Sequence, residues 1–105
     1  MRLLSTRAEI FLAQEQFDRS LEAAQVVLDL QPGMLRALVV RGRTLLMLGR
    51  HAEAELDLRL VAEQQPNSPA DLFALAEVLR LQGKNDEAIA IYRRILELQP
   101  GNPNV

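Results

Sequence analysis

Few side chains in this sequence are of the types that carry covalent or acid–base chemistry. His51 is the only histidine, and it lies at the expected start of a helix, where we expect it to be exposed. Ser5, Ser20 and Ser68 have no histidine near them in the sequence that could act as their general base. The sequence therefore offers no nucleophile and base at a catalytic spacing.

The carboxylates and the cysteine content lead to the same expectation for metal and cofactor chemistry. Glu53 and Asp57 are four residues apart and so share one face of a helix, but carboxylates in such a position are normally solvated. They are not accompanied by a glycine-rich phosphate loop or by residues at metal-ligand spacing. The chain has no cysteine, which excludes disulfides and thiolate sites. We therefore expect no enzyme, no cofactor and no metal site.

The composition is that of an ordinary soluble protein. The 105 residues amount to about one small domain, and 49% of them are hydrophobic, which is enough to order the chain. The net charge of −2 gives no general attraction to nucleic acid or to anionic membranes. No apolar run approaches the length of a membrane span, so we expect a soluble protein of the cytoplasm or periplasm without direct membrane insertion. Eleven arginines against the single Lys84 indicate a GC-rich genome and favour a bacterial source.

The elements that must position any functional side chain follow from an internal repeat. Pro32, Pro66 and Pro100 are separated by a constant step of 34 residues, and each follows a similar tail that ends in Gln-Pro. Small residues and large apolar residues keep the same step: Leu4, Leu38 and Leu72; Ala8, Gly42 and Ala76; Phe11, Leu45 and Leu79; Ser20, Ala54 and Ala88. Chance rarely preserves both kinds of position. The chain is therefore predicted to consist of three repeats, 1–34, 35–68 and 69–102.

Each repeat is predicted to contain two helices. In the second repeat the apolar spacing predicts one helix over 35–48 and another over about 51–64. Gly49 and Gly83 are expected to end first helices, because glycine takes the left-handed conformation found there. Ser68 and Asn85 are expected to cap helices. No segment alternates with period two, so the protein is predicted to be all-α.

The recurring small residues have a packing explanation. Two antiparallel helices approach closely only where a side chain is short, and Gly42 on a first helix and Ala54 on a second helix are examples of such positions. A large residue there is expected to overpack the helix pair, at a cost of roughly 1–3 kcal/mol.

These features resemble the tetratricopeptide repeat, whose unit is a 34-residue pair of helices. The third repeat matches its pattern best, at Leu72, Leu75, Ala76, Leu79, Gly83, Ala88, Tyr92 and Pro100. Departures include Glu15, where the other repeats have glycine, and Arg41 and Glu55 at positions that are usually apolar. The terminal prolines, the 34-residue step and the acidic balance disfavour the RNA-binding pentatricopeptide repeat. The resemblance implies a right-handed α-solenoid of three tandem helix–turn–helix repeats.

The resemblance also implies a concave groove, lined by the first helices, that receives a protein or peptide. The family's groove positions fall on Arg2, Ser5, Glu9 and Leu12, on Arg36, Val39, Arg43 and Leu46, and on Ala70, Phe73, Glu77 and Arg80. Val39, Leu46 and Phe73 are candidate anchors for apolar side chains of a partner. Arg36, Arg43 and Arg80 are candidates to pair with its carboxylates, although each could instead be solvated or paired with a neighbour.

One subtype of the family is not expected. Some members hold a C-terminal carboxylate, as on chaperone tails, with lysine, asparagine and arginine side chains. The corresponding residues here are Ser5, Glu9, Val40, Ala70 and Ala74. None supplies the required donor, and Glu9 would repel a carboxylate.

Two functions from different classes follow. The first is a protein- or peptide-binding scaffold that uses the groove, and the alternative is a structural spacer or self-assembly segment of a larger repeat protein. Adding 34 to Ser68 and Pro69 gives Asn102 and Pro103, again a capping residue and a first-turn proline, so we expect a piece of a longer array. The last helix, about 86–99, is then expected to expose some of its apolar residues Ile91, Ile95 and Leu98. We expect weak self-association through that helix.

Overall fold

The computed structural model describes the backbone of residues 2–98 and the side chains of residues 6–98. Its helices are α1 (Arg2–Ala13), α2 (Phe17–Leu30), α3 (Leu35–Met47), α4 (His51–Gln64), α5 (Pro69–Leu81) and α6 (Asn85–Glu97). No strand occurs within residues 2–98. The all-α prediction is therefore confirmed, and the predicted helices of the second repeat match α3 and α4 to within one residue.

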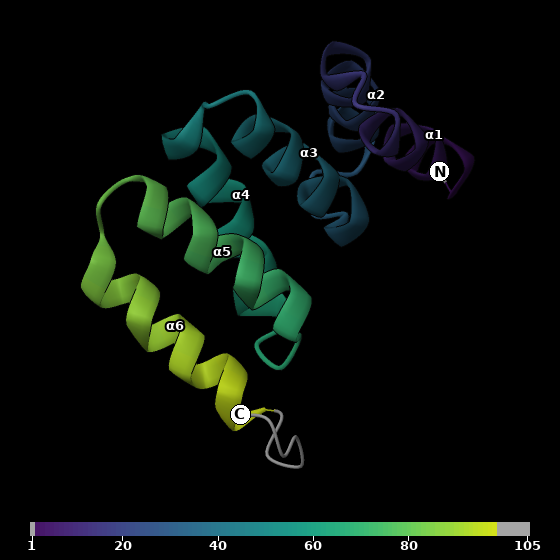
Figure 1. Ribbon diagram of the computed structural model, residues 1–105. Helices are drawn as coiled ribbons and strands as arrows, with labels where there is room; N and C mark the ends of the chain where they lie inside the picture. The colour runs from purple at the N-terminus through teal and green to yellow at the C-terminus, as the bar shows by residue number, and fades with distance from the viewer. Residues whose placement is uncertain (1, 99–105) are drawn as a thin grey trace.

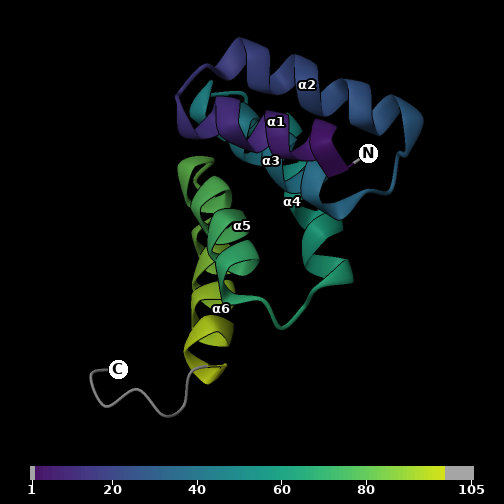
Figure 2. The same ribbon diagram turned by 90° about the vertical axis from the view of Figure 1, so that its right-hand side faces the viewer.

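The helices form pairs that stack in chain order. α1 packs on α2, α3 on α4 and α5 on α6, and each pair also packs on the next through α2 with α3 and α4 with α5 (Figure 1). α3 contacts both α1 and α5, so these three helices form one row (Figure 1). In the view turned by 90°, α2 lies outside α1 at one end of the stack, and α6 lies beside α5 at the other (Figure 2). The chain is thus an α-solenoid of helix–turn–helix repeats, while the repeat boundaries 1–34, 35–68 and 69–102 stay a prediction.

Short side chains occupy the contacts between helices, as the repeat predicted. The recurring small residues are all buried: Ala8, Ser20, Gly42, Ala54, Ala76 and Ala88. A Cβ atom on Gly42 would lie 2.9 Å from both Cγ and Cδ2 of Leu58, so α3 and α4 approach too closely there for any larger residue. Ser20 is the one polar member of the set. Its hydroxyl lies 2.8 Å from Oγ1 of Thr44 and donates a 3.3 Å hydrogen bond to the carbonyl of Ala8, which satisfies a buried polar group and links α1, α2 and α3.

The turns inside the repeats use the left-handed conformation at one fixed position. Gly49 and Gly83 both have φ of 80°, as expected for residues that end a helix. Glu15, one repeat earlier, has φ of 58°. The turn geometry is therefore kept even where the sequence departs from glycine.

The helix starts follow the prediction less closely. Ser68 is the N-cap residue of α5 and Pro69 is its first residue, but the Ser68 side chain makes no capping hydrogen bond. The prediction for Asn85 was wrong. Lys84 occupies the N-cap position, and Asn85 is already the first residue of α6. These helices begin at equivalent positions of the repeat, because the packing of a helix contributes more to its stability than a capping hydrogen bond does.

Arg41, one of the charged residues at a usually apolar position, binds three helices together. Its Nε and Nη2 donate hydrogen bonds of 2.8 Å to the two carboxylate oxygens of Asp57, and its Nη1 donates one of 2.8 Å to Oε1 of Gln25. The expectation that Glu53 and Asp57 are both solvated was therefore wrong for Asp57, which is buried. Only Glu53 is exposed, and it pairs with Arg50. The two carboxylates differ because Arg41, on the neighbouring helix α3, binds Asp57 and not Glu53.

Glu55, the second such residue, joins the second repeat to the third. Its carboxylate accepts hydrogen bonds of 2.6 Å from Arg59, 2.9 Å from Lys84 and 2.6 Å from Gln82, and Arg59 also pairs with Glu87 at 2.7 Å. Burial alone would raise the pKa of Glu55, but the hydrogen bonds from Lys84, Arg59 and Gln82 outweigh it and lower the pKa from 4.5 to about 2. The polar departures from the family pattern are thus links between helices of different repeats.

The apolar surface of α6 differs from the expectation. Ile91, Ile95 and Leu98 are partly buried, and Ile91 packs against the core cluster around Leu79. The large apolar residues that α6 exposes are Ile89 and Leu96. The three predicted residues are therefore only partly exposed, because α5 covers part of the inner face of α6. Asn102 and Pro103, on which the expected fourth helix pair depends, lie outside the described residues.

Within residues 2–98, no helix combines the length and the apolar character that a membrane span requires.

Candidate peptide-binding groove

A hollow of about 740 Å³ opens along the row formed by α1, α3 and α5. Its lining is predominantly apolar and comes from all three helices, with additions from the α1–α2 turn, from the start of α2 and from α6. The lining residues are Leu12, Ala13, Glu15, Phe17, Arg43, Leu46, Met47, Pro69, Ala70, Phe73, Ala74, Glu77 and Ile95. A concave, apolar surface with few polar groups is the usual form of a binding site. We refer to this hollow as the groove.

The groove brings together about half of the residues predicted for it. Leu12, Arg43, Leu46, Ala70, Phe73 and Glu77 line it. Glu9, Arg36 and Val39 are on α1 and α3 outside this lining, and Arg80 is on α5 one turn beyond Glu77. The side chains of Arg2 and Ser5 lie outside the described residues.

The apolar anchors differ in how far they reach the surface. Leu46 and Val39 are partly buried, and each packs against a core cluster. Phe73 is 51% exposed, and its ring meets that of Tyr92 edge-on, with the ring centroids 6.1 Å apart. An exposed aromatic ring held in place by a second ring is a suitable contact for an apolar side chain of a partner.

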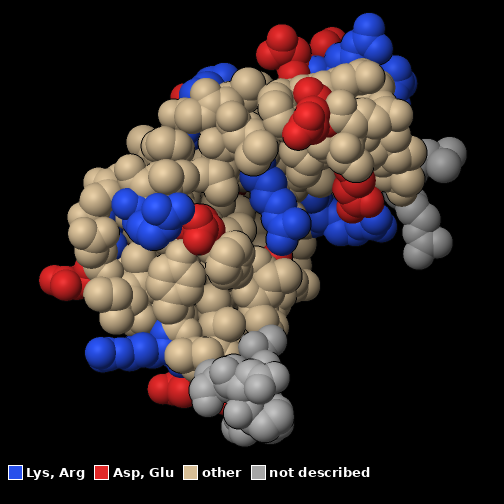
Figure 3. Space-filling view, in the orientation of Figure 1, with Lys and Arg blue, Asp and Glu red and all other residues tan. Residues whose placement is uncertain are grey.

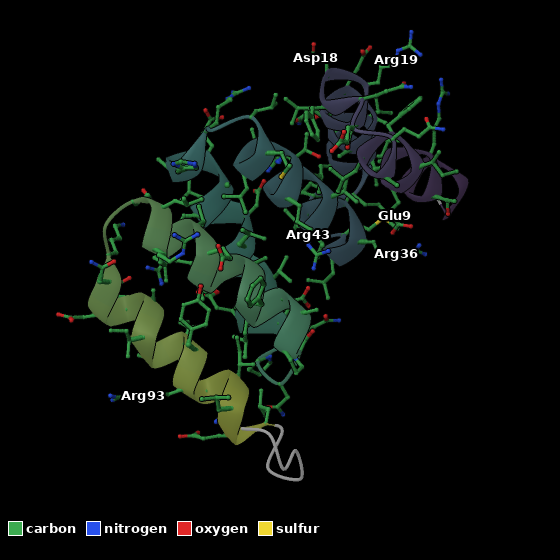
Figure 4. All side chains as sticks on the ribbon, viewed as in Figure 1. Glu9, Asp18, Arg19, Arg36, Arg43 and Arg93 are labelled. Atoms are coloured by element: carbon green, nitrogen blue, oxygen red, sulfur yellow. The ribbon has the colours of Figure 1, made fainter. Side chains whose placement is uncertain are left out.

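Glu9 and Arg36 neutralise each other beside the groove. Nε and Nη2 of Arg36 donate hydrogen bonds of 2.9 and 2.7 Å to the two carboxylate oxygens of Glu9. These bonds raise the pKa of the Arg36 guanidinium. Figure 4 shows the two side chains directed toward each other at the α1 end of the row. Arg36 is therefore a paired arginine.

Glu77 and Arg80 form a second neutral pair. Arg80 donates a hydrogen bond of 2.7 Å to Oε2 of Glu77, and the hydroxyl of Tyr92 donates one of 2.7 Å to Oε1. The bond from Arg80, with that from Tyr92, lowers the pKa of the Glu77 carboxyl. Burial and the nearby carboxylate raise the pKa of Tyr92. This cluster joins α5 to α6 and fixes the ring that supports Phe73.

Arg43 differs from Arg36 and Arg80 in having no charged partner among the described side chains. It lies partly buried in the groove lining, and among the described side chains it makes no hydrogen bond and no ion pair. Figure 4 shows its side chain extending from α3 on the face turned to the viewer, and Figure 3 shows that uncharged residues cover much of this face. The groove therefore holds one arginine whose donors are open to a ligand.

Several lining residues were not predicted. Met47 follows Leu46 at the end of α3, and Phe17 is the first residue of α2, a helix whose residues were not considered for the groove. Ile95 enters from α6. The family's groove positions lie on first helices only. Phe17 and Ile95 belong to second helices, so the sequence pattern could not predict that they line the groove.

A second hollow, of about 670 Å³, lies on the opposite side between α2 and α4. Its charged residues are Asp18, Glu22, Asp29, Arg41, Arg50, Glu53 and Asp57. Arg41 and Arg50 are occupied by Asp57 and Glu53, so the remaining charge on this outer surface is acidic.

Metal-binding groups and the position of His51 complete the description of the two hollows. Within residues 6–98, no three histidine, aspartate or glutamate side chains are grouped closely enough to hold a metal ion. His51 is partly buried at the start of α4, rather than fully exposed as expected, and it lines neither hollow.

Comparison with known proteins places the chain in a family. Residues 5–69 match one family model described as tetratricopeptide repeat, and residues 69–105 match a second with the same description. Neither match is to a catalytic family.

Curated relatives are much longer than this chain. The phagocyte signaling-impaired protein of Drosophila pseudoobscura pseudoobscura is 30% identical over 84 residues, which make up 80% of this chain and 9% of that protein. Cellulose synthase operon protein C of Salmonella typhimurium is 28% identical over 103 residues, or 97% of this chain and 9% of that protein. The chain thus spans less than a tenth of the length of these relatives.

Solved structures share the fold. The first tetratricopeptide domain of Spaghetti (RPAP3), solved with the HSP90 peptide SRMEEVD, has a TM-score of 0.86 at 22% identity and covers 96% of this chain and 80% of that one. MamA from Desulfovibrio magneticus RS-1 has a TM-score of 0.87 at 18% identity, covering 94% and 56%. The Thermobaculum terrenum O-GlcNAc transferase has a TM-score of 0.88 at 24% identity, covering 95% of this chain but 19% of that one. The two family-model matches, over residues 5–69 and 69–105, show that the chain belongs to the tetratricopeptide repeat family, and its helix pairs with their small-residue contacts agree with this.

Proposed function

We propose that this chain is a protein- or peptide-binding scaffold whose partner lies in the groove along α1, α3 and α5. The observation that carries the proposal is the groove lining, which presents the exposed ring of Phe73 and the partly buried Leu12 and Leu46 on one concave surface. Apolar side chains spaced along a rigid concave surface suit the apolar face of a helix or an extended segment. We propose that the binding surface extends beyond the groove lining to the other predicted residues: Arg2, Glu9, Arg36, Val39 and Arg80.

The solved relatives support a partner of this class but not its identity. The RPAP3 domain of the same fold was solved with an HSP90 peptide. In the present chain the positions expected for a carboxylate clamp do not suit such a tail. Val40 and Ala74 are buried, and Glu9 is paired with Arg36. We therefore propose an internal segment of a partner, rather than a free C-terminus, as the ligand.

The test compares matched substitutions on the two sides of the solenoid. Phe73→Asp places a charge in the groove, and Leu56→Asp places the same charge on the outer face of α4, where Leu56 is 68% exposed. Partners would be captured from the source cell with the wild-type chain and then measured against each variant, with thermal melting as the check on folding. We expect Phe73→Asp to abolish binding and Leu56→Asp to leave it unchanged. Loss of binding by Leu56→Asp alone would reject the groove.

The alternative is a structural spacer or self-assembly segment, and one observation favours it. The outer helices expose apolar residues one turn apart, Val26 and Leu30 on α2 and Leu56 and Leu60 on α4. Such residues are suited to packing against another part of a larger assembly. If this alternative is correct, sedimentation will show association that rises with concentration and that Leu56→Asp removes. A monomer at all concentrations counts against self-association, including the association expected through α6.

A further inference from the structure

We propose that the segment bound in the groove carries an aspartate or glutamate side chain next to a large apolar side chain, and that Arg43 receives its carboxylate. This inference depends on the proposed function, because it assigns the chemistry of the ligand at the same site. It adds a specificity-determining residue and a class of ligand.

The arrangement of charges along the row singles out Arg43. Glu9, Arg43 and Glu77 occupy the same position in successive repeats, 34 residues apart, so carboxylates flank Arg43 on both sides. Both carboxylates are already bound, Glu9 by Arg36 at 2.7 Å and Glu77 by Arg80 at 2.7 Å. Arg36 and Arg80 thus each have a carboxylate partner, whereas no described side chain pairs with Arg43.

The surroundings of Arg43 strengthen any bond that it forms. Leu12, Leu46, Met47 and Phe73 line the same groove, so a bound segment would exclude water from the guanidinium. A hydrogen bond between charged groups is stronger in such surroundings than at an open surface. The planar guanidinium offers a pair of donors that match the two oxygens of a carboxylate. The same apolar residues would contact the neighbouring apolar side chain of the ligand.

The charge balance of the groove favours a single carboxylate over a phosphate group. The charged residues of the lining are Arg43, Glu15 and Glu77, and Glu77 is neutralised by Arg80. Phosphate recognition normally uses a cluster of arginines, whereas this lining holds a single arginine, Arg43, and a carboxylate in the α1–α2 turn, that of Glu15; neither is paired with another described side chain. Glu15 repels an acidic group from that end of the groove, so the acidic side chain of the ligand is directed to Arg43.

The experiment uses short random peptides displayed between two constant segments, so that no free C-terminal carboxylate is offered. The whole chain is the target. We expect the selected peptides to be enriched in aspartate or glutamate within one turn of a large apolar residue. A selected peptide is then resynthesised with its acidic residue and with the matching amide, and both are measured against the wild type, Arg43→Gln and Arg93→Gln. Arg93 is the matched control, because it is exposed on α6 and is absent from the groove lining.

Arg43→Gln should weaken binding of the acidic peptide by about tenfold, and the amide peptide should bind the wild type equally weakly. In Arg43→Gln, replacement of the acidic residue of the peptide by its amide should weaken binding little further. Such non-additivity would identify that carboxylate and the Arg43 guanidinium as partners. Arg93→Gln should bind like the wild type, and Glu15→Gln should bind the acidic peptide more tightly. Selected peptides without acidic residues, or equal effects of Arg43→Gln and Arg93→Gln, would overturn the assignment to Arg43 while leaving peptide binding intact. If no peptide binds, the proposed function fails and this inference fails with it.

Discussion

Arg41 and Asp57 join α3 to α4 through two parallel hydrogen bonds of 2.8 Å, from Nε to Oδ2 and from Nη2 to Oδ1. The Asp57 side chain is 5% exposed and the Arg41 side chain 25%. A two-bond pair of this kind fixes the relative rotation of the helices as well as their separation. It takes the place of an apolar contact in the middle repeat.

Replacement of Arg41 by methionine should destabilise the protein by about 2–3 kcal/mol, because it leaves the Asp57 carboxylate buried without its partner. Denaturation with urea measures the change. The matched control is Arg50→Met, which removes an arginine from the exposed pair with Glu53. That control should change the stability by less than about 0.5 kcal/mol. Equal effects of the two substitutions would show that burial of Asp57 has no energetic consequence.

Acid should weaken the connection between the second and third repeats through Glu55. Its pKa is about 2 in the folded chain, below the ordinary value of 4.5, so folding favours the ionised form. The stabilisation is fully present above about pH 4.5 and is lost as the pH falls from 4.5 toward 2. Free energies of unfolding measured across this range should fall less steeply for Glu55→Gln than for the wild type.

The removal of a hydrogen-bond donor to Glu55 provides the control for this pH dependence. Lys84→Met keeps the carboxylate but removes its bond from Nζ, so the pKa of Glu55 should move back toward its ordinary value. The free energy of unfolding of Lys84→Met should therefore also depend less steeply on pH than that of the wild type. Curves of the wild type and both variants that run parallel would contradict the role assigned to Glu55.

Glu15→Gly should stabilise the protein. Glu15 has φ of 58°, a conformation that costs residues with a Cβ roughly 1–2 kcal/mol and glycine almost nothing. Allowing for the greater flexibility of glycine in the unfolded chain, we expect a gain of about 1 kcal/mol in thermal or urea denaturation. The neighbouring Gln14, whose φ is not positive, serves as the control: Gln14→Gly should give no gain. A loss of stability in Glu15→Gly would show that its side chain stabilises the turn.

Gly42→Ala should be destabilising, although alanine favours helices more than glycine by about 1 kcal/mol. The added Cβ would lie 2.9 Å from Leu58 Cγ, and the Leu58 side chain is buried in a core cluster. We expect a net loss of about 1–3 kcal/mol, with a larger loss for Gly42→Val. Gly33→Ala is the control, since a Cβ there meets nothing within 4 Å, and it should be neutral or slightly stabilising. A stabilised Gly42→Ala would mean that α3 and α4 separate readily.

The regular spacing of residues allowed the fold to be predicted. The proline step, the recurring small residues and the turn glycines identified the helix pairs, and Ala8, Gly42 and Ala54 lie buried where that pattern requires short side chains. Such features are local or repeated at a fixed step, so they can be recognised without knowledge of the tertiary structure. The start of α6 could not be predicted in this way, because helix packing decides where the helix begins, and Lys84 rather than Asn85 is its N-cap residue.

The polar contacts depend on the tertiary structure. The sequence does not indicate that Arg36 and Arg80 are paired whereas Arg43 has no partner among the described side chains, and the spacing of Glu53 and Asp57 gives no indication that only Asp57 is buried. These differences arise from distances of a few ångströms between side chains on different helices, and hydrogen bonding and charge pairing change steeply over such distances. The repeat, the helices and the small-residue contacts could be inferred from the order of the residues alone. The packing of the helices sets which charged groups bind each other and which have no partner among the described side chains.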